Sequence, residues 1–185
     1  MRMSHLVLAL AAILALPVLA EQVVFEQSPT ASGFFSDLKS HPSLDLQIEA
    51  DSFQLAVPVQ LTRLEFWGSV DSDYFDAFRI RIFTDESGLP GTEIFSQDFT
   101  AVANVVEGDY RRYEISLPEI TALELDDQTI YWVSVAGANA FTGNPVASEI
   151  FYWAVGDVVG YARQLGLAAP WQAATFAQPA FRLHG

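Results

Sequence analysis

The chain contains no cysteine among its 185 residues. Disulfide bonds, a thiolate nucleophile and cysteine-ligated metal sites are therefore excluded. Lysine is almost as scarce, because Lys39 is the only one. Only two histidines, His41 and His184, lie beyond the first twenty residues. Since a histidine-based zinc site usually takes three or more protein ligands, we expect both histidines to be exposed and without a metal.

Basic residues are few compared with acidic ones. The 9 Lys and Arg face 23 Asp and Glu, which gives a formal net charge of −14 at pH 7. Such a field repels phosphate backbones and anionic lipid headgroups, so no nucleic acid and no membrane surface is expected as a partner. The acids fit either a solvated surface that keeps the protein in solution or the binding of divalent cations. The solvated surface is the favoured interpretation.

The first twenty residues have the layout of a secretory signal peptide. Arg2 gives a positive start, residues 6–16 are an unbroken apolar run, and small or apolar residues precede a cleavage site after Ala20. A run this short falls well below the roughly 20 residues needed to cross a bilayer, so no membrane span is expected after cleavage. We therefore predict an exported protein, periplasmic or extracellular, in which residues 21–185 form one domain.

Alternation of apolar and polar residues indicates β-strands. In AFRIRIFTD (77–85), the apolar residues from Phe78 to Ile82 alternate with Arg79 and Arg81, which is the pattern of a half-buried strand. Comparable patterns predict strands over 22–27, 51–57, 60–68, 92–99, 111–118, 129–137, 149–155 and 179–185. About nine short strands without helical periodicity predict an all-β domain, a single β-sandwich.

Several of these stretches also occur in a characteristic order. They are VVFEQ (23–27), EADSFQL (49–55), LTRLEFWGSV (61–70), FRIRIFTDESGLPGTEIF (78–95), LELDDQTIYWVSVAG (123–137) and PAFRLHG (179–185). Together they resemble a widespread family of exported bacterial β-sandwich domains with the motifs A-D-D-F, W-G, G-x-P-G, Y-W-[LV]-S and A-F-x-L-x-G. Such domains often sit in PEP-CTERM or choice-of-anchor surface proteins. The resemblance implies a jelly-roll-like sandwich similar to carbohydrate-binding modules, without established catalytic residues.

The chain departs from this family pattern in two places. Ser52 stands where A-D-D-F has its second acid, which weakens the idea that this pair holds a cation. No apolar tail follows Gly185 in the sequence, so we expect a released protein rather than one that is sorted to the cell surface.

Three acids in VDSDYFDAF (70–78) resemble half of a calcium loop. Asp71, Asp73 and Asp76 alternate closely enough to supply several oxygen ligands. An EF-hand loop needs Asp or Asn at its fifth position and Gly at its sixth, and Phe75 and Asp76 stand there instead. The stretch is predicted to be a hydrated loop, with calcium as the alternative. No cofactor is required.

The aromatic residues suggest where a sugar would bind. Trp67 and Trp132 lie in apolar strand contexts and are predicted to be core residues. The stretches 28–44 and 156–177 have few strand signals and are expected to be surface loops. The predicted contact face combines aromatic rings from the second loop and the strand before it with one arginine to hold hydroxyls. It consists of Trp153, Tyr161, Trp171 and Arg163.

These observations predict a non-catalytic extracytoplasmic module that binds a glycan or a cell-surface or matrix component, or that has a purely structural role. The alternative is a small glycan-active hydrolase or lyase that uses a pair of carboxylates. The sequence identifies no such pair, and the G-x-S-x-G motif of serine hydrolases is absent.

Overall fold

A computed structural model describes residues 21–29, 34–36, 47–70, 77–101, 103–107, 110–117, 123–138, 151–154, 156, 161–166, 169–174 and 179–185. Within these ranges the chain forms fifteen strands and no α-helix, which confirms the predicted all-β fold. The signal peptide predicted over 1–20 lies outside the described residues. No helix in the described ranges has the length and apolar character needed to cross a membrane.

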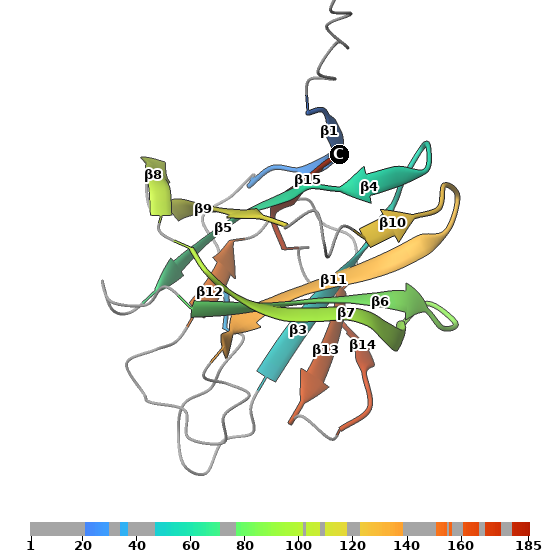
Figure 1. Cartoon of the computed structure of the whole chain (residues 1–185). Helices are drawn as coiled ribbons and strands as arrows, with labels where there is room; N and C mark the ends of the chain where they lie inside the picture. Colours follow the sequence, from blue (N-terminus) through green and yellow to red (C-terminus); the bar gives the residue numbers. More distant parts are fainter. Residues whose placement is uncertain are drawn as a thin grey trace, which may run out of the picture.

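One sheet has seven strands, all antiparallel to their neighbours (Figure 1). Its strands are β1 (Val23–Gln27), β2 (Phe34–Ser36), β5 (Arg63–Val70), β8 (Ala103–Glu107), β9 (Tyr110–Ser116), β12 (Phe151–Ala154) and β15 (Phe181–His184). One edge of β5 pairs with β9. Its other edge is shared end to end by β15 and β12, because Phe66 pairs with Phe181 and Gly68 pairs with Trp153. β15 thus lies between β1 and β5.

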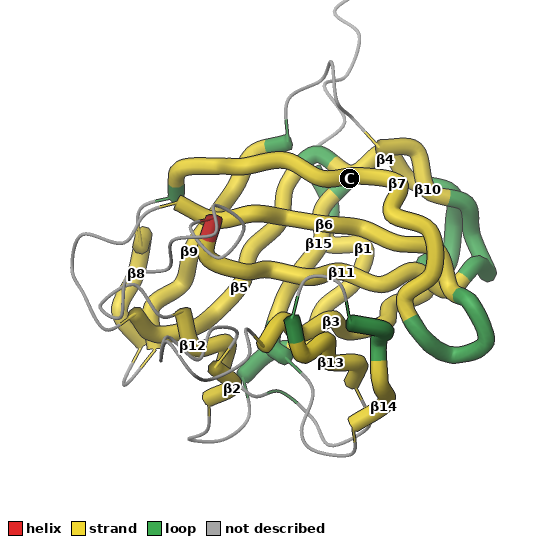
Figure 2. The backbone as a smooth tube through the Cα atoms, turned by 90° about the horizontal axis from the view of Figure 1, so that it is seen from below, coloured by secondary structure: helices red, strands yellow, loops and turns green. Residues whose placement is uncertain are grey.

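The second sheet has six antiparallel strands in the order β14-β13-β3-β11-β6-β7, which can be followed in Figure 2. They are β3 (Gln47–Gln54), β6 (Ala77–Asp85), β7 (Pro90–Thr100), β11 (Ile130–Gly137), β13 (Tyr161–Leu165) and β14 (Gln172–Ala174). β13 pairs with β3 only over residues 47–50, whereas β11 pairs with residues 51–54 on the opposite edge. A separate pair is formed by β4 (Val59–Leu61) and β10 (Leu123–Leu125).

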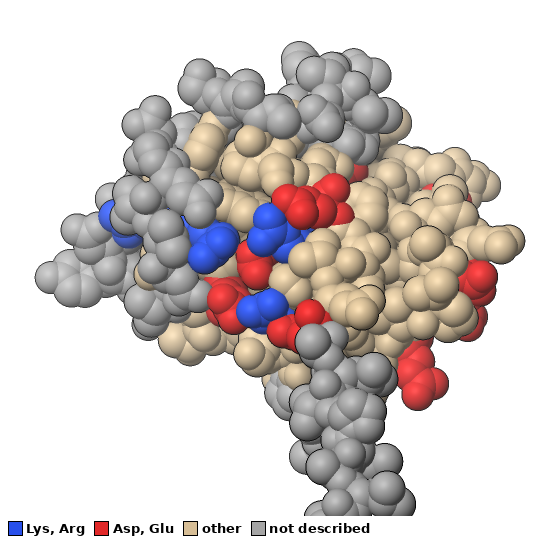
Figure 3. Space-filling model, turned by 90° about the horizontal axis from the view of Figure 1, so that it is seen from above, with Lys and Arg blue, Asp and Glu red and all other residues tan. Residues whose placement is uncertain are grey.

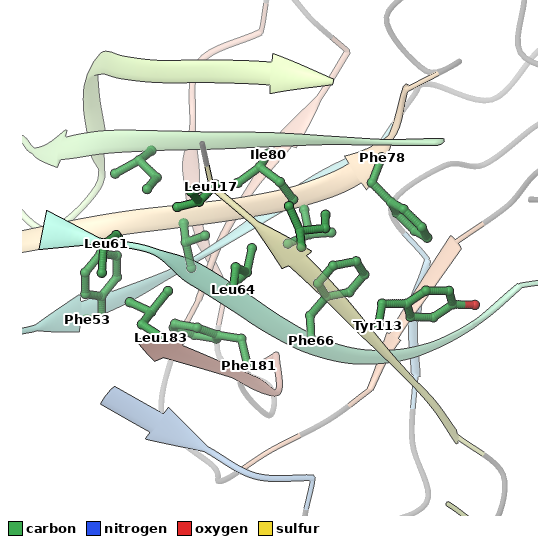
Figure 4. Close-up of a cluster of buried hydrophobic side chains, with 14 of the residues drawn as sticks. Phe53, Leu61, Leu64, Phe66, Phe78, Ile80, Tyr113, Leu117, Phe181 and Leu183 are labelled. Atoms are coloured by element: carbon green, nitrogen blue, oxygen red, sulfur yellow. The ribbon is translucent and has the colours of Figure 1, made fainter. Parts of the chain in front are cut away.

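The two large sheets meet across one hydrophobic core (Figure 4). The alternation in β6 points Phe78, Ile80 and Ile82 into it, and all three are at most 1% exposed. The ring of Phe66, from β5, meets that of Phe78 edge to face with centroids 5.0 Å apart. Complete burial of such a side chain contributes about 1.5–3 kcal/mol, so the rings shared by both sheets are a main source of stability.

Fifteen strands replace the predicted nine in the described residues. The six additions, β2, β4, β8, β10, β13 and β14, are only three to five residues long. The loop predicted over 156–177 is wrong, because β13 and β14 lie within it, and β2 lies within the loop predicted over 28–44. Such short segments become strands because a neighbouring strand pairs with them, a cause that local periodicity does not reveal. The jelly-roll connection of the strands stays a prediction.

Candidate functional site

Two of the four predicted sugar-contact residues are buried in the interior. Trp153 has no exposed surface, and its Nε1 donates a hydrogen bond to the carbonyl of Ala180 at 2.8 Å. Tyr161 is 4% exposed. The prediction that these two rings contact a sugar is therefore wrong. For Tyr161 the physical cause is the pairing of residues 162–165 with β3, which turns an expected surface loop into part of a sheet, whereas Trp153 lies on β12, which pairs with β5.

Tyr161 lies in an environment that favours its neutral phenol. Burial raises the pKa of Tyr161 to about 12, and the negative charge of Glu49 adds to this rise while Arg163 opposes it. The phenol consequently keeps its proton throughout the physiological pH range. Tyr161 is an uncharged part of the interior rather than an acid or base for a reaction.

Arg163 and Trp171 are both half-buried, but they lie on opposite faces of the six-stranded sheet. Arg163 pairs in register with Glu49, which shares the inward face of β3 with the core residue Phe53. The neighbouring Ala162 points outward and packs in the same cluster as Trp171. Of the four predicted residues, only Trp171 is therefore left as an aromatic contact on an outer face.

Trp171 belongs to an aromatic patch on the outer face of the six-stranded sheet, which consists of Phe83, Trp132 and Trp171. The rings of Trp171 and Phe83 meet edge to face, with centroids 5.5 Å apart and planes at 76°. The surrounding aliphatic residues are Ala50, Leu89 and Ala162. Phe83 and Trp132 are buried, so Trp171 is the ring of the patch with the most exposed surface.

Trp132 is buried, but on this outer cluster rather than between the sheets. Its Nε1 donates a hydrogen bond to Asp85 Oδ1 at 2.8 Å. The other oxygen of Asp85 accepts the N–H of Gly88 at 3.1 Å, where the backbone φ of +80° favours glycine. One carboxylate therefore anchors both the tryptophan and the turn between β6 and β7.

Charged side chains border the aromatic patch along β6 and β7. The guanidinium of Arg81 lies over the Phe83 ring, 4.6 Å from its centroid, and its Nε lies 2.5 Å from Glu93 Oε2. One step further along, Arg79 forms a two-pronged pair with Asp98 at 2.6 and 2.8 Å. The Glu93 side chain is 39% exposed, so this border is open to solvent. These charged side chains place hydrogen-bond donors and acceptors beside the aromatic patch.

Phe83 and Arg81 are site residues that the sequence argument missed. A signal for them exists, because strict alternation from Phe78 to Ile82 assigns the intervening arginines and Phe83 to the opposite face of β6. An aromatic residue on the polar side of a strand marks either a contact surface or a second cluster.

The outer face of the seven-stranded sheet carries a network of charges instead (Figure 3). Glu65 lies at its centre and is 5% exposed. Arg182 Nη1 donates to Glu65 Oε2 at 3.0 Å, and His184 Nε2 lies 2.9 Å from Glu65 Oε1. Arg63 Nη2 lies 2.9 Å from His184 Nδ1. The expectation of an exposed His184 is wrong, because this network buries it to 3% exposure.

Further acids surround this network and balance its arginines. Arg63 pairs with Glu21 and with Glu114, each at 3.0 Å. Arg182 Nη2 donates to Glu26 Oε1 at 2.7 Å, and this hydrogen bond holds the pKa of Glu26 below its ordinary value. The charges on this face thus bind one another, which leaves less attraction for an external ion.

At the seam between the two sheets, Asp51 links β3 to β1. Its Oδ2 accepts a hydrogen bond from Gln27 Nε2 at 3.2 Å, and its Oδ1 accepts the N–H of Ser52 at 2.8 Å. The same Gln27 nitrogen donates to the Pro179 carbonyl at 2.8 Å. Asp51 is the first acid of the A-D-D-F-like stretch, and in this structure it joins strands of the two sheets.

Next to this link lies a pocket of about 350 Å³ that is wide open to solvent, called the seam cavity below. Its lining comes from β1, from β3 and from the start of β11, and consists of Phe25, Gln27, Ser52, Phe53, Gln54 and Ile130. The quoted sequence stretches VVFEQ and EADSFQL contribute five of these six residues. The sequence argument did not identify this site, because the two stretches belong to different sheets and only the folded chain brings them together.

Glu49 and Asp51 are two neighbouring carboxylates that can be compared with the catalytic pair of a glycoside hydrolase. They lie two residues apart on one face of β3, which places their Cα atoms about 7 Å apart. Both have no exposed surface, and neither lines the seam cavity. A catalytic pair has to reach the scissile bond from both sides. The described structure therefore gives these two acids a structural position.

The predicted calcium ligands Asp71, Asp73 and Asp76 lie outside the described residues. Among the residues that the structure describes, no group of three or more His, Asp or Glu side chains is arranged to hold a metal ion. The calcium site stays a prediction.

Comparison with known proteins gives no relative for this chain. No family model, no curated protein and no solved structure matches it. The resemblance to exported bacterial sandwich domains accordingly rests on the motif order alone, and the geometry of the sites has to carry the functional argument.

Proposed function

We propose that this chain is an exported, non-catalytic β-sandwich module that binds glycans through the aromatic patch. The observation that carries this proposal is the position of Trp171. Its side chain is partly exposed on an outer sheet face and packs edge to face on Phe83, and the guanidinium of Arg81, which pairs with Glu93, lies over the same Phe83 ring. Sugar rings have a C–H face that packs on aromatic rings and hydroxyls that bond to such charged groups.

The hydrolase alternative receives less support from the structure. Its best carboxylate pair, Glu49 and Asp51, is enclosed, whereas the half-exposed Trp171 needs no bond-breaking chemistry to explain it. A purely structural role in a matrix is the remaining alternative, and it predicts that removal of the Trp171 ring leaves ligand binding unchanged.

The test is a glycan array probed with residues 21–185, followed by calorimetry on the glycans that are retained. Trp171→Ala is expected to weaken binding about tenfold, which corresponds to about 1.4 kcal/mol. Trp171→Phe should retain part of the affinity, because it keeps a ring at this position. Val57→Ala, at a 58% exposed site away from the patch, is the matched control and should bind like the unaltered protein. Equal affinity of Trp171→Ala and the control would reject the aromatic patch as the site.

A further inference from the structure

The seam cavity has one apolar wall that is already rigid. The rings of Phe25 and Phe53 lie with centroids 5.9 Å apart, and Phe25 is also stacked on Phe181 at 5.1 Å. Phe53 is 2% exposed and Phe181 has no exposed surface, so they hold the partly exposed ring of Phe25 in place, and a ligand would find this ring preformed. Ile130, which is 43% exposed, adds an aliphatic side chain.

The polar part of the lining is uncharged and able both to donate and to accept hydrogen bonds. It consists of two carboxamides and one hydroxyl, from Gln27, Gln54 and Ser52. Gln27 is fixed in orientation, because its Nε2 donates to Asp51 and to the Pro179 carbonyl and so uses both amide hydrogens. What Gln27 offers to the cavity is therefore the acceptor Oε1.

The absence of charge in this lining narrows the class of ligand. No Asp, Glu, Lys, Arg or His is among the described residues that line the seam cavity. The nearby carboxylate of Asp51 is occupied with Gln27 and Ser52. An ionic ligand would lose its hydration here without gaining a counter-charge, whereas a neutral polar ligand exchanges water for the carboxamides and the hydroxyl.

We propose that the seam cavity is a second binding site, which takes one neutral saccharide residue. A sugar ring combines hydroxyls, which both donate and accept, with a C–H face suited to the partly exposed ring of Phe25. The volume of about 350 Å³ lies in the range of cavities that hold small ligands. This proposal shares its class of ligand with the proposed function, but it uses different residues and holds or fails independently of the aromatic patch.

The experiment is a titration of isotope-labelled residues 21–185 with the neutral methyl glycosides of glucose, galactose, mannose and xylose, followed by NMR. At least one glycoside is expected to shift the carboxamide signals of Gln27 and Gln54. Gln54→Ala should weaken this binding about 2- to 10-fold, as expected for the loss of one hydrogen bond. Ile130→Phe should weaken it further, because a larger side chain occupies the cavity. Both positions are exposed, so the thermal melting of the two variants should stay close to that of the unaltered protein.

Two further arms separate the seam cavity from the aromatic patch and from other ligands. Trp171→Ala should leave the shifts of Gln27 and Gln54 unchanged, even if it abolishes binding on the glycan array. Glucuronate and glucosamine, which carry charges, should bind at least about tenfold more weakly than the neutral glycoside. The proposal is overturned if no neutral glycoside shifts these signals, if Gln54→Ala and Ile130→Phe bind normally, or if a charged sugar or an extended peptide binds better.

Discussion

On the outer face of the seven-stranded sheet, Glu65 is 5% exposed and in contact with Arg182 and His184. On the outer face of the six-stranded sheet, the Glu93 side chain is 39% exposed and pairs with Arg81. On the outer face of the seven-stranded sheet, the charged side chains pair with one another. The outer face of the six-stranded sheet combines the pair of Arg81 and Glu93 with the partly exposed side chain of Trp171. This combination makes it the better surface for an external ligand.

This difference shows that charge density is a poor guide to a binding face. Four glutamates and three arginines gather on the seven-stranded sheet, yet their pairing there satisfies most of the attraction they could offer. Aromatic rings that pack on one another can still contact a ligand, because a ring that packs edge to face on its neighbour keeps part of its own face available.

The largest expected effect comes from removing Glu65, and the removal of Glu93 is the comparison on the other outer face. Glu65→Ala leaves Arg182 and His184 without their buried partner and should lower the free energy of unfolding by about 3 kcal/mol or more. Glu93→Ala removes an exposed pair and should cost less than about 1 kcal/mol. Urea denaturation of residues 21–185 measures both. Equal losses would show that the two faces do not differ as described.

The interior between the two faces gives the next largest effect, through Tyr161. Its pKa is about 12 in the folded protein and close to 10 when unfolded, so the folded state holds the proton more tightly. The free energy of unfolding is therefore highest below pH 10 and should fall by up to about 2.7 kcal/mol as the pH rises from 10 to 12.

Tyr161→Phe isolates this contribution from those of the other ionisable groups. Burial also raises the pKa of Tyr113, but Tyr113 is present in both proteins and cancels in the difference. Between pH 8 and pH 11 the difference in urea midpoint between the two proteins should shift in favour of Tyr161→Phe as the pH increases, because only the unaltered protein loses stability by this titration. Parallel curves would show that Tyr161 titrates normally.

A smaller effect concerns the anchor of the aromatic patch. Trp132→Phe removes the hydrogen bond from Nε1 to Asp85 and should cost about 2 kcal/mol, the range for a bond to a charged group. A double-mutant cycle with Asp85→Ala separates this bond from the loss of ring volume and from the contact of Asp85 with Gly88. A coupling energy near zero would contradict the role of Asp85.

The smallest expected effect is the response of the six-stranded sheet to salt. The Asp98 side chain is 51% exposed, so its pair with Arg79 should contribute less than about 1 kcal/mol and should be screened at 1 M NaCl. Asp98→Ala should therefore lower stability slightly at low salt and not at high salt. A loss that persists at high salt would assign the aspartate a role beyond its charge.

Much of the fold is readable from the sequence where large apolar residues alternate. β6, β7, β11 and β15 are predicted within a few residues of their true ends, because their apolar residues alternate with polar ones or, in β11, occupy both faces. β13 is not, since its central residues Ala162 and Arg163 carry little periodic signal and are ordered by pairing with β3.

The candidate sites were less predictable for the same reason. Trp153 was assigned to a contact face because a presumed loop follows it, although Phe151 two residues earlier already indicates that both rings point inward. The burial of His184 depends on Glu65, and the seam cavity depends on β1 meeting β3. Neither contact can be predicted from the local sequence pattern.

The place of β15 between β1 and β5 also governs when this protein is able to fold. Translation delivers β1 before the other described strands and β15 after them, and in the described structure only β15 joins β1 to the rest of its sheet. Until β15 has been synthesised, β1 is unable to join the seven-stranded sheet, so this layer of the fold closes late.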